Sequence, residues 1–386
     1  MTITRSKARS GAAALGSMFL TATLSVTAAA HDNEGAYTQT NLVSDGSVAA
    51  QHIDAHLVDP WGLVIGPTNP AWVSDRGAGV STLYDGLGEP FPVASPLVVT
   101  IPKAATASPI TGPTGIVITT STANQFVVSS GAASAPSIFL FATFDGSIAG
   151  WAPTVLPTTA VTAVDQSAGG ASFTGLARAN NGTATFLYAT DFHNGKVVAF
   201  DTAFKPATLT GTFTDPKVPA DFSPFNIQNI GGVLYVTYAP KNLFTAKSTA
   251  QGNRGIVDIF DANGALVRRF ASFGALNAPW GVAQAPANFG RFSNDIIIGN
   301  FGSGNILAFD PNNGEFRGEL RTAQGEPLVN QGLWALSFGN GLQNQPTNTL
   351  FFTAGVGMGQ HGLYGSITAA APTSSHEGHE GGSFGY

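Results

Sequence analysis

The stretch DPWGLVIGPTNPAWVSDRGAGVSTLYD, residues 59–85, decides the fold because the chain repeats it. One clear copy occupies residues 173–201 (FTGLARANNGTATFLYATDFHNGKVVAFD), and another occupies residues 279–310 (PWGVAQAPANFGRFSNDIIIGNFGSGNILAFD). In each copy a mid-repeat Asp or Asn precedes the closing Asp by ten positions, at 75 and 85, 191 and 201, and 300 and 310. Chance rarely preserves such a spacing, so the three segments are copies of one structural unit.

Three weaker copies fill the gaps and begin at Pro113, Pro224 and Leu333, which makes six units that start roughly 51 to 60 residues apart. Each unit contains short runs rich in Val, Ile, Phe and Tyr, bounded by Gly, Asn, Asp or Pro. In the second unit we assign the strands after the first to residues 125–129 and 137–141. A repeat of about fifty residues made of short antiparallel strands is typical of a propeller blade. A β-sandwich does not repeat a whole meander six times, so the sequence predicts an all-β, six-bladed β-propeller.

The two ends of the repeat region predict how the ring closes. After the strand at residues 364–368 the sixth unit has no segment for an outer strand, because the chain runs into a Gly-, His- and Glu-rich stretch. We expect this stretch, residues 370–386, to be a flexible tail. Before the first unit stands an orphan strand-like segment, residues 37–43. We expect this N-terminal segment to become the outer strand of the last blade and to cover its exposed edge.

Residues 1–30 read as a signal peptide, with a positive start, an apolar middle and a small-x-small site that ends at Ala30. The alternative is an uncleaved membrane anchor, but Ser and Thr interrupt the apolar run. We therefore expect a mature chain without a transmembrane anchor, secreted or periplasmic, whose propeller spans residues 31–369.

The charge of the chain limits the classes of molecule that it could bind. Three of its 17 Lys and Arg residues lie in the signal peptide, so 14 remain against 23 Asp and Glu, a net charge near −9. An acidic surface argues against nucleic acid and anionic lipid as partners. The absence of cysteine excludes thiolate catalysis and Cys-based metal sites. We expect a monomer that binds an unknown extracellular ligand or protein.

Polar side chains recur where the second strand of a unit ends, at Asp75, Asp191 and Asn300. In an antiparallel meander these positions share a face with the mouth of the central channel, where loops on a rigid scaffold carry function. One interpretation is that the two carboxylates cap tight turns by accepting backbone N–H bonds. The other is that they bind a divalent cation such as Ca²⁺ in the channel, with Asn300 in the ligand site. No cofactor is certain.

Trp61, Trp280 and Trp334 occupy the same position in three units, and Phe225 occupies it in a fourth. These rings either pack between blades near the axis or form an aromatic rim that stacks on a sugar or an apolar ligand. Both interpretations remain open, and the three tryptophans are our candidate ligand-binding residues.

Three histidines make a second candidate metal site. His52 and His56 lie on the connection into the first unit, and His361 lies in a turn of the sixth unit, its neighbour in a closed ring. Together they could bind a transition metal. The alternative is that each is an ordinary isolated histidine.

The phrase Pro-x-Gly-Ile/Val, a strand ending in Asp, and Gly-x-Ile/Val-x-x-Phe-Asp resembles the NHL-repeat type of six-bladed propeller. More narrowly, residues 41–45, 59–63 and 299–302 resemble a family of uncharacterised exported bacterial proteins, and this resemblance covers nearly the whole mature chain. It implies a propeller and an export route, but no reaction.

Standard enzymatic motifs are missing, including Gly-x-Ser-x-Gly, a phosphate-binding Gly-Lys-Ser/Thr and His-Glu-x-x-His. Our first hypothesis is therefore a binding module that acts through its channel-mouth face. The alternative is a metal-dependent hydrolase, for instance a lactonase, with Asp75, Asp191 and Asn300 near the metal. Whether the protein is an enzyme stays open at this point.

Overall fold

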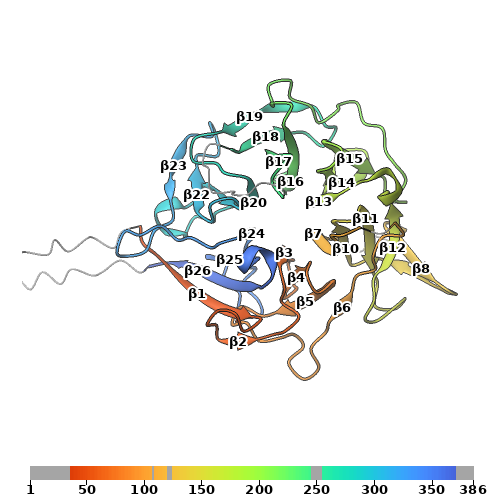
Figure 1. Cartoon of the computed structure of the whole chain (residues 1–386), viewed down its shortest axis with the longest axis horizontal. Helices are drawn as coiled ribbons and strands as arrows, with labels where there is room; N and C mark the ends of the chain where they lie inside the picture. The colour runs from red at the N-terminus through yellow and green to blue at the C-terminus, as the bar shows by residue number, and fades with distance from the viewer. Residues whose placement is uncertain (1–34, 107, 120–123, 245–253, 371–386) are drawn as a thin grey trace, which may run out of the picture. The chain divides into compact units, whose positions relative to one another are not determined.

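The computed structural model describes residues 35–106, 108–119, 124–244 and 254–370. Its main strands form six sheets around a central axis, antiparallel except for one short parallel pair in the sixth, as Figure 1 shows. The innermost strands of successive sheets are neighbours all round the ring, and the inner strand of the sixth sheet contacts that of the first. The predicted six-bladed β-propeller is thus confirmed.

The first three blades contain eleven strands. From the axis outward, blade 1 is β3 (Pro60–Ile65), β4 (Ala71–Asp75), β5 (Val80–Tyr84) and β6 (Val99–Thr100); blade 2 is β7 (Pro113–Ile118), β10 (Phe139–Thr143), β11 (Ser147–Trp151) and β12 (Val161–Asp165); blade 3 is β13 (Phe173–Asn180), β14 (Thr185–Asp191) and β15 (Lys196–Phe200). A short 3₁₀ helix, η1 (Ser167–Gly169), precedes blade 3.

The last three blades follow the same order. Blade 4 is β16 (Phe222–Ile230), β17 (Val233–Pro240), β18 (Ile256–Phe260) and β19 (Leu266–Ser272); blade 5 is β20 (Pro279–Gln284), β21 (Ile296–Asn300), β22 (Ile306–Phe309) and β23 (Phe316–Glu319); blade 6 is β24 (Leu333–Phe338), β25 (Thr349–Ala354), β26 (Leu363–Ala369), β1 (Tyr37–Ser44) and β2 (His52–Ile53). Two further short elements are η2 (Gly290–Phe292) and a four-residue helical turn, α1 (Val356–Gly359).

The first strand of the propeller closes the ring. β1 pairs antiparallel with β26, from Tyr37 opposite Ala369 to Ser44 opposite Leu363. Tyr37 and Val43 of this strand are buried in two of the core clusters, so β1 covers the edge of β26 and also adds side chains to the core. The predicted closure by the N-terminal strand is confirmed.

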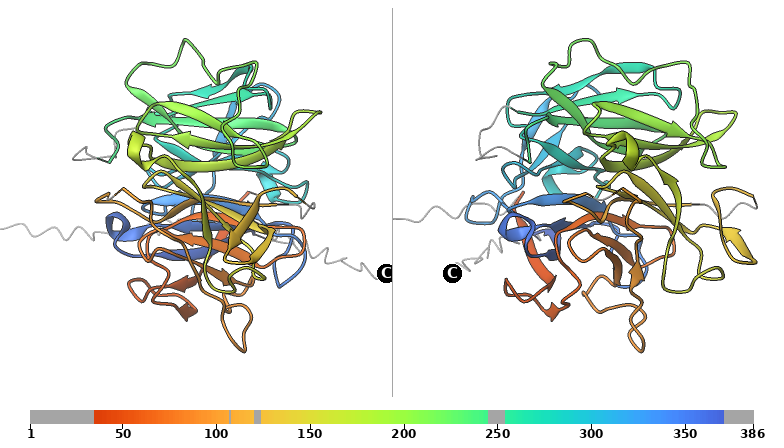
Figure 2. Two further views of the ribbon diagram at one scale, coloured as in Figure 1. Left: turned by 90° about the vertical axis from the view of Figure 1, so that its right-hand side faces the viewer. Right: turned by 45° about the vertical axis from the view of Figure 1, so that its right-hand side comes forward.

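The strand assignment in the second unit was wrong. Val127–Ser130 (β8) pairs with Ala133–Pro136 (β9) in a separate hairpin that projects from the second blade (Figures 1 and 2). The second strand of the blade is instead β10, which the sequence had suggested as the third. The two strands differ in burial: every residue of β10 is buried, whereas Val128 is the one buried residue of the four in β8.

The glycine of the Pro-x-Gly phrase marks where inner strands touch. A Cβ atom on Gly62 would lie 2.3 Å from the Thr114 carbonyl oxygen, and one on Gly115 would lie 2.4 Å from the Leu176 nitrogen. Neighbouring blades therefore approach at distances that only glycine permits. The axial space that they leave is about 20 Å³, which is room for about one water molecule.

Two predicted segments lie outside the described residues: the signal peptide, residues 1–30, and the tail beyond Ala370. Within the described part of the chain, no helix has the length and apolar character needed to cross a bilayer.

Candidate binding site at the channel mouth

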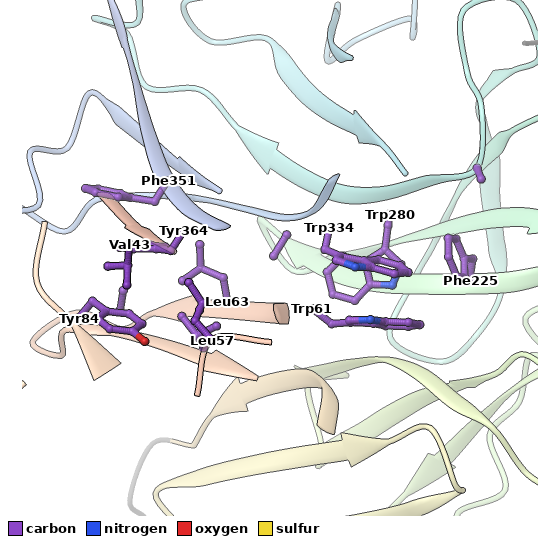
Figure 3. Close-up of a cluster of buried hydrophobic side chains, with 14 of the residues drawn as sticks. Val43, Leu57, Trp61, Leu63, Tyr84, Phe225, Trp280, Trp334, Phe351 and Tyr364 are labelled. Carbon is purple, nitrogen blue, oxygen red and sulfur yellow. The ribbon is translucent and has the colours of Figure 1, made fainter. Parts of the chain in front are cut away.

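Four aromatic rings fill the axis where the inner strands begin. Trp61, Phe225, Trp280 and Trp334 come from blades 1, 4, 5 and 6, and none is more than 4% exposed. The rings of Trp61 and Trp334 stack with centroids 3.6 Å apart, and Trp280 meets Trp334 edge to face at 5.8 Å. Figure 3 shows the three indoles gathered beside Phe225. We call these four residues the inner layer; they pack between blades, as one of the two interpretations has it.

A second set of six residues occupies equivalent positions in the blades, each directly after the last residue of the second strand. In each blade this residue donates its backbone N–H to a carbonyl just before the inner strand, over 2.8–3.1 Å. The six positions, which we call the mouth ring, are Arg76, Phe144, Phe192, Lys241, Phe301 and Gly355. Phe301 stacks on Trp334 at 4.2 Å, and Phe144 meets Trp61 edge to face at 5.7 Å. Aromatic packing therefore continues from the inner layer to the mouth.

The carboxylate of Asp59 ties the two layers together. It accepts hydrogen bonds from the indole nitrogens of Trp61 (2.9 Å) and Trp334 (3.2 Å), and it forms an ion pair with Arg76. The Arg76 guanidinium also lies 5.8 Å from the Trp61 ring centroid, within the range of a cation–π contact. Burial raises the pKa of Asp59, while Arg76 and the two indoles oppose this rise.

The backbone of Asp59 has a φ of 47°. This left-handed conformation is uncommon for residues other than Gly, Asn and Asp. The equivalent position before the inner strand is Gly112 in blade 2 and Gly332 in blade 6, both with positive φ. The first blade thus has a carboxylate where two other blades have glycine.

Phe244 covers this assembly on its solvent side. It follows β17 in a turn, the residue is 36% exposed, and its ring stacks on Trp61 with centroids 5.9 Å apart. The channel mouth is therefore a partly exposed aromatic surface with one buried ion pair beneath its edge.

Asp75 lies in the interior beside Thr82. The Thr82 hydroxyl donates a hydrogen bond of 2.8 Å to Oδ2, and Oδ1 has no hydrogen-bond partner among the described residues. Burial raises the pKa of this carboxyl well above its usual range, and the Thr82 hydrogen bond opposes the rise only in part.

Asp191 and Asn300 fasten turns to neighbouring loops. Asp191 accepts the backbone N–H of Ser172 at 3.1 Å and the side-chain amide of Asn194 at 2.7 Å. Asn300 accepts the N–H of Asn277 at 2.9 Å and donates to the Ala275 carbonyl at 2.9 Å. At Asp191 the geometry is that of the capping interpretation.

The predicted histidine site is not assembled. His56 contacts Asp54 at 2.9 Å and His361 contacts Asp45 at 2.7 Å, while His52 lies 3.9 Å from Glu89. In the parts of the chain that the structure describes, no three His, Asp or Glu side chains form a group that could hold a metal ion.

The sequence interpretation missed Asp59 and Phe244. A clue to the mouth ring was present, because Arg76, Phe192 and Phe301 each follow directly after Asp75, Asp191 or Asn300. Asp59 stands at the start of the repeated phrase, but the sequence does not show its role, because its second indole partner is 275 residues away. Phe244 lies outside the repeated phrase and had no sequence signal.

No protein-family model matches the chain. Among solved structures, a protein of unknown function from Bacteroides thetaiotaomicron has a TM-score of 0.53 at 11% identity, covering 86% of this chain and 76% of that one. At this identity the likeness concerns the fold alone. Two sequences of Acanthamoeba polyphaga mimivirus are much more similar. The uncharacterized protein R648 is 32% identical over 84% of this chain and 78% of its own length, and the uncharacterized protein L690 is 32% identical over 84% of each. The chain belongs to the protein family that includes these two mimivirus proteins.

Proposed function

We propose that this propeller is an exported binding module that takes its ligand at the channel mouth. The observation that carries the proposal is the aromatic assembly there, to which all six blades contribute a ring and in which Phe144, Phe244 and Phe301 keep exposed surface. Aromatic side chains offer a large contact area at a small cost in conformational entropy, and they are enriched in binding sites.

The ion pair between Asp59 and Arg76 supports the same site. Binding pockets combine an apolar lining with a few fixed polar groups that orient the ligand. The Arg76 side chain is 19% exposed and is held by Asp59 beside the Trp61 ring. It is the polar group of the first blade that a ligand at the mouth would meet.

The hydrolase alternative has less support. It needs Asp75, Asp191 and Asn300 to share a cation, but Asp191 and Asn300 are engaged by turns and Asp75 is buried under Thr82. A binding module therefore accounts better for these side chains.

The proposal is tested with a thermal-shift screen of the mature protein against a mixed library of oligosaccharides, aromatic acids and short peptides. Each hit is repeated with Phe144→Ala, which alters the mouth ring, and with Leu342→Ala, which alters an exposed residue in the loop after the inner strand of blade 6, at the other end of the channel. We expect hits whose affinity falls about tenfold or more in Phe144→Ala and is unchanged in Leu342→Ala. A screen without hits, or hits that respond equally to both variants, would contradict the proposal.

A further inference from the structure

Phe244 lies at the meeting point of five blades. Its ring contacts one aromatic ring from each of blades 1 to 5, with centroid distances between 5.3 and 6.3 Å: Trp61, Phe144, Phe192, Phe225 and Phe301. These contacts place it over the axis and above the inner layer.

The five rings around Phe244 form a seat suited to a flat aromatic ring. Trp61 offers its face, with an interplanar angle of 22°, while Phe144 and Phe192 stand at 82° and 70°. One stacked and several edge-to-face contacts are the arrangement that the charge distribution of an aromatic ring favours. A saturated ring of the same size would fill the seat but would lose this part of the interaction.

Phe244 is the most exposed ring of the cluster. Phe225 beneath it is wholly buried and Trp61 is only 2% exposed, whereas Phe244 is 36% exposed. The neighbouring Leu243, which is buried and donates its backbone N–H to the Pro240 carbonyl, anchors the turn that carries Phe244. Phe244 therefore lies at the solvent boundary of the assembly, where a ligand ring would compete with it for the seat.

We propose that the seat of Phe244 is the binding site for an aromatic ring of the ligand, and that Phe244 occupies it as an internal substitute which the ligand displaces. The ligand class is then a small molecule that carries a phenyl-sized aromatic ring. This inference rests on the proposed function and names the chemistry that the mouth recognises.

The experiment compares two probes that differ only in aromaticity. N-acetyl-phenylalaninamide carries a phenyl ring, and N-acetyl-cyclohexylalaninamide carries its saturated equivalent. Dissociation constants are measured by NMR titration for the wild type, for Phe244→Ala and for Phe273→Ala. Phe273 is the matched control because it is 37% exposed, close to the 36% of Phe244, but its ring contacts Phe222 and none of the mouth residues.

Removing the internal ring should strengthen binding of the aromatic probe. We expect Phe244→Ala to bind N-acetyl-phenylalaninamide about tenfold more tightly than the wild type, because each competing ring contact corresponds to about two- to tenfold in affinity and Phe244 makes five of them. Phe273→Ala should match the wild type, and the saturated probe should bind Phe244→Ala more weakly than the aromatic one. Should Phe244→Ala fail to fold, Phe244→Leu keeps an apolar side chain and should give an intermediate gain.

Two results would overturn the inference: equal affinity of the wild type and Phe244→Ala for the aromatic probe, or no preference for the aromatic over the saturated probe. If library compounds without an aromatic ring still bind at the mouth, only this inference fails. If nothing binds there, the proposed function fails as well.

Discussion

The carboxylate of Asp59 holds Arg76 of the mouth ring and two indoles of the inner layer in place, so its replacement should lower the free energy of unfolding. In Asp59→Ala the Arg76 guanidinium loses its counter-ion and both indole N–H groups lose their acceptor. We expect the free energy of unfolding to fall by about 3 kcal/mol, the size of effect seen when one partner of a buried ion pair is removed. Urea denaturation followed by tryptophan fluorescence measures it.

Asp59→Asn separates the charge from the geometry. Asparagine tolerates the φ of 47° at this position and keeps an oxygen that can accept from the indoles. It should therefore lose less than Asp59→Ala. Equal losses in the two variants would show that the charge alone matters and that the two indole bonds contribute nothing.

Asp75 predicts a dependence of stability on pH. Because burial raises the pKa of this carboxyl above its value in the unfolded chain, the folded protein holds the proton more tightly. The stability from this group is thus fully present below the unfolded pKa, near 3.8, and is lost as the pH rises toward the folded pKa. We expect Asp75→Asn to be similar to the wild type at pH 4 and more stable than it at pH 8, by urea denaturation.

Asp310 provides the opposite control. The backbone N–H of Asn312 and the side chain of Arg317 lower the pKa of Asp310. The stability that the ionised Asp310 contributes is present above the pKa of the unfolded state and is lost as the pH falls through the pKa of the folded state. Asp310→Asn should therefore be less stable than the wild type at neutral pH, with the difference shrinking in acid. If the free energy of unfolding of the wild type rises relative to that of Asp75→Asn as the pH increases, the interpretation of Asp75 is wrong.

Among the elements, β1 carries the closure of the ring. A variant that begins at Asp45 lacks β1, so β26 becomes an exposed edge and the buried surfaces of Tyr37, Leu42 and Val43 are lost. Each of these side chains contributes about 1.5–3 kcal/mol when buried, so we expect the melting temperature to fall by more than about 10 °C. A variant that begins at Asn33 keeps β1 and is the control. Equal melting curves for the two would exclude β1 as the closing element.

The inner strands make a second prediction, at the glycine of β7. Alanine at Gly115 would place its Cβ 2.4 Å from the Leu176 nitrogen in β13, so the two blades would have to separate. We expect Gly115→Ala to lower the free energy of unfolding by about 1–3 kcal/mol through overpacking. Gly169→Ala is the matched control, because no atom lies within 4 Å of the added Cβ. Calorimetry of the two variants should separate them clearly.

The repeat in the sequence predicts the strands of some blades but not of others. Blades 1, 3 and 5 could be predicted from local spacing, because the turn after the second strand uses the same Asp or Asn and the same following turn in each. Blade 2 could not, since the hairpin β8–β9 has the apolar residues of a strand but sits between β7 and β10. Which apolar run enters a blade depends on packing against the neighbouring blade, and the local sequence does not record that.

At the scale of the whole molecule, export remains a prediction from residues 1–30. Expressed in a bacterium, the protein should be released with His31 at its N-terminus, because Ala28 and Ala30 form the small-x-small site. Intact-mass spectrometry of the exported fraction checks this. Ala28→Leu should block the cleavage, and a wild type that keeps residues 1–30 would contradict the signal-peptide interpretation.

Some residues of the candidate site could be predicted from the repeat, and others depend on the closed ring. The positions of Trp61, Trp280 and Trp334 near the axis follow from their place in the repeat, and their burial agrees with packing between blades. The role of Asp59 depends on Trp334, and the role of Phe244 depends on rings from five blades. Such groupings arise only when the ring closes, so neither residue could be identified before the fold was known.

Because the first strand of the propeller pairs with the last, the ring cannot close until the end of the chain is available. During synthesis β1 has to wait for β26, which lies more than 300 residues later, and contacts so distant in sequence form slowly. Blades 1 to 5 can pair internally in that interval, which makes closure the final step of folding. The seam between blades 1 and 6 contains the Trp61–Trp334 stack at 3.6 Å. The last kinetic phase of refolding should therefore include a change in the fluorescence of these two tryptophans, and that change should be absent when Trp61 and Trp334 are replaced by phenylalanine.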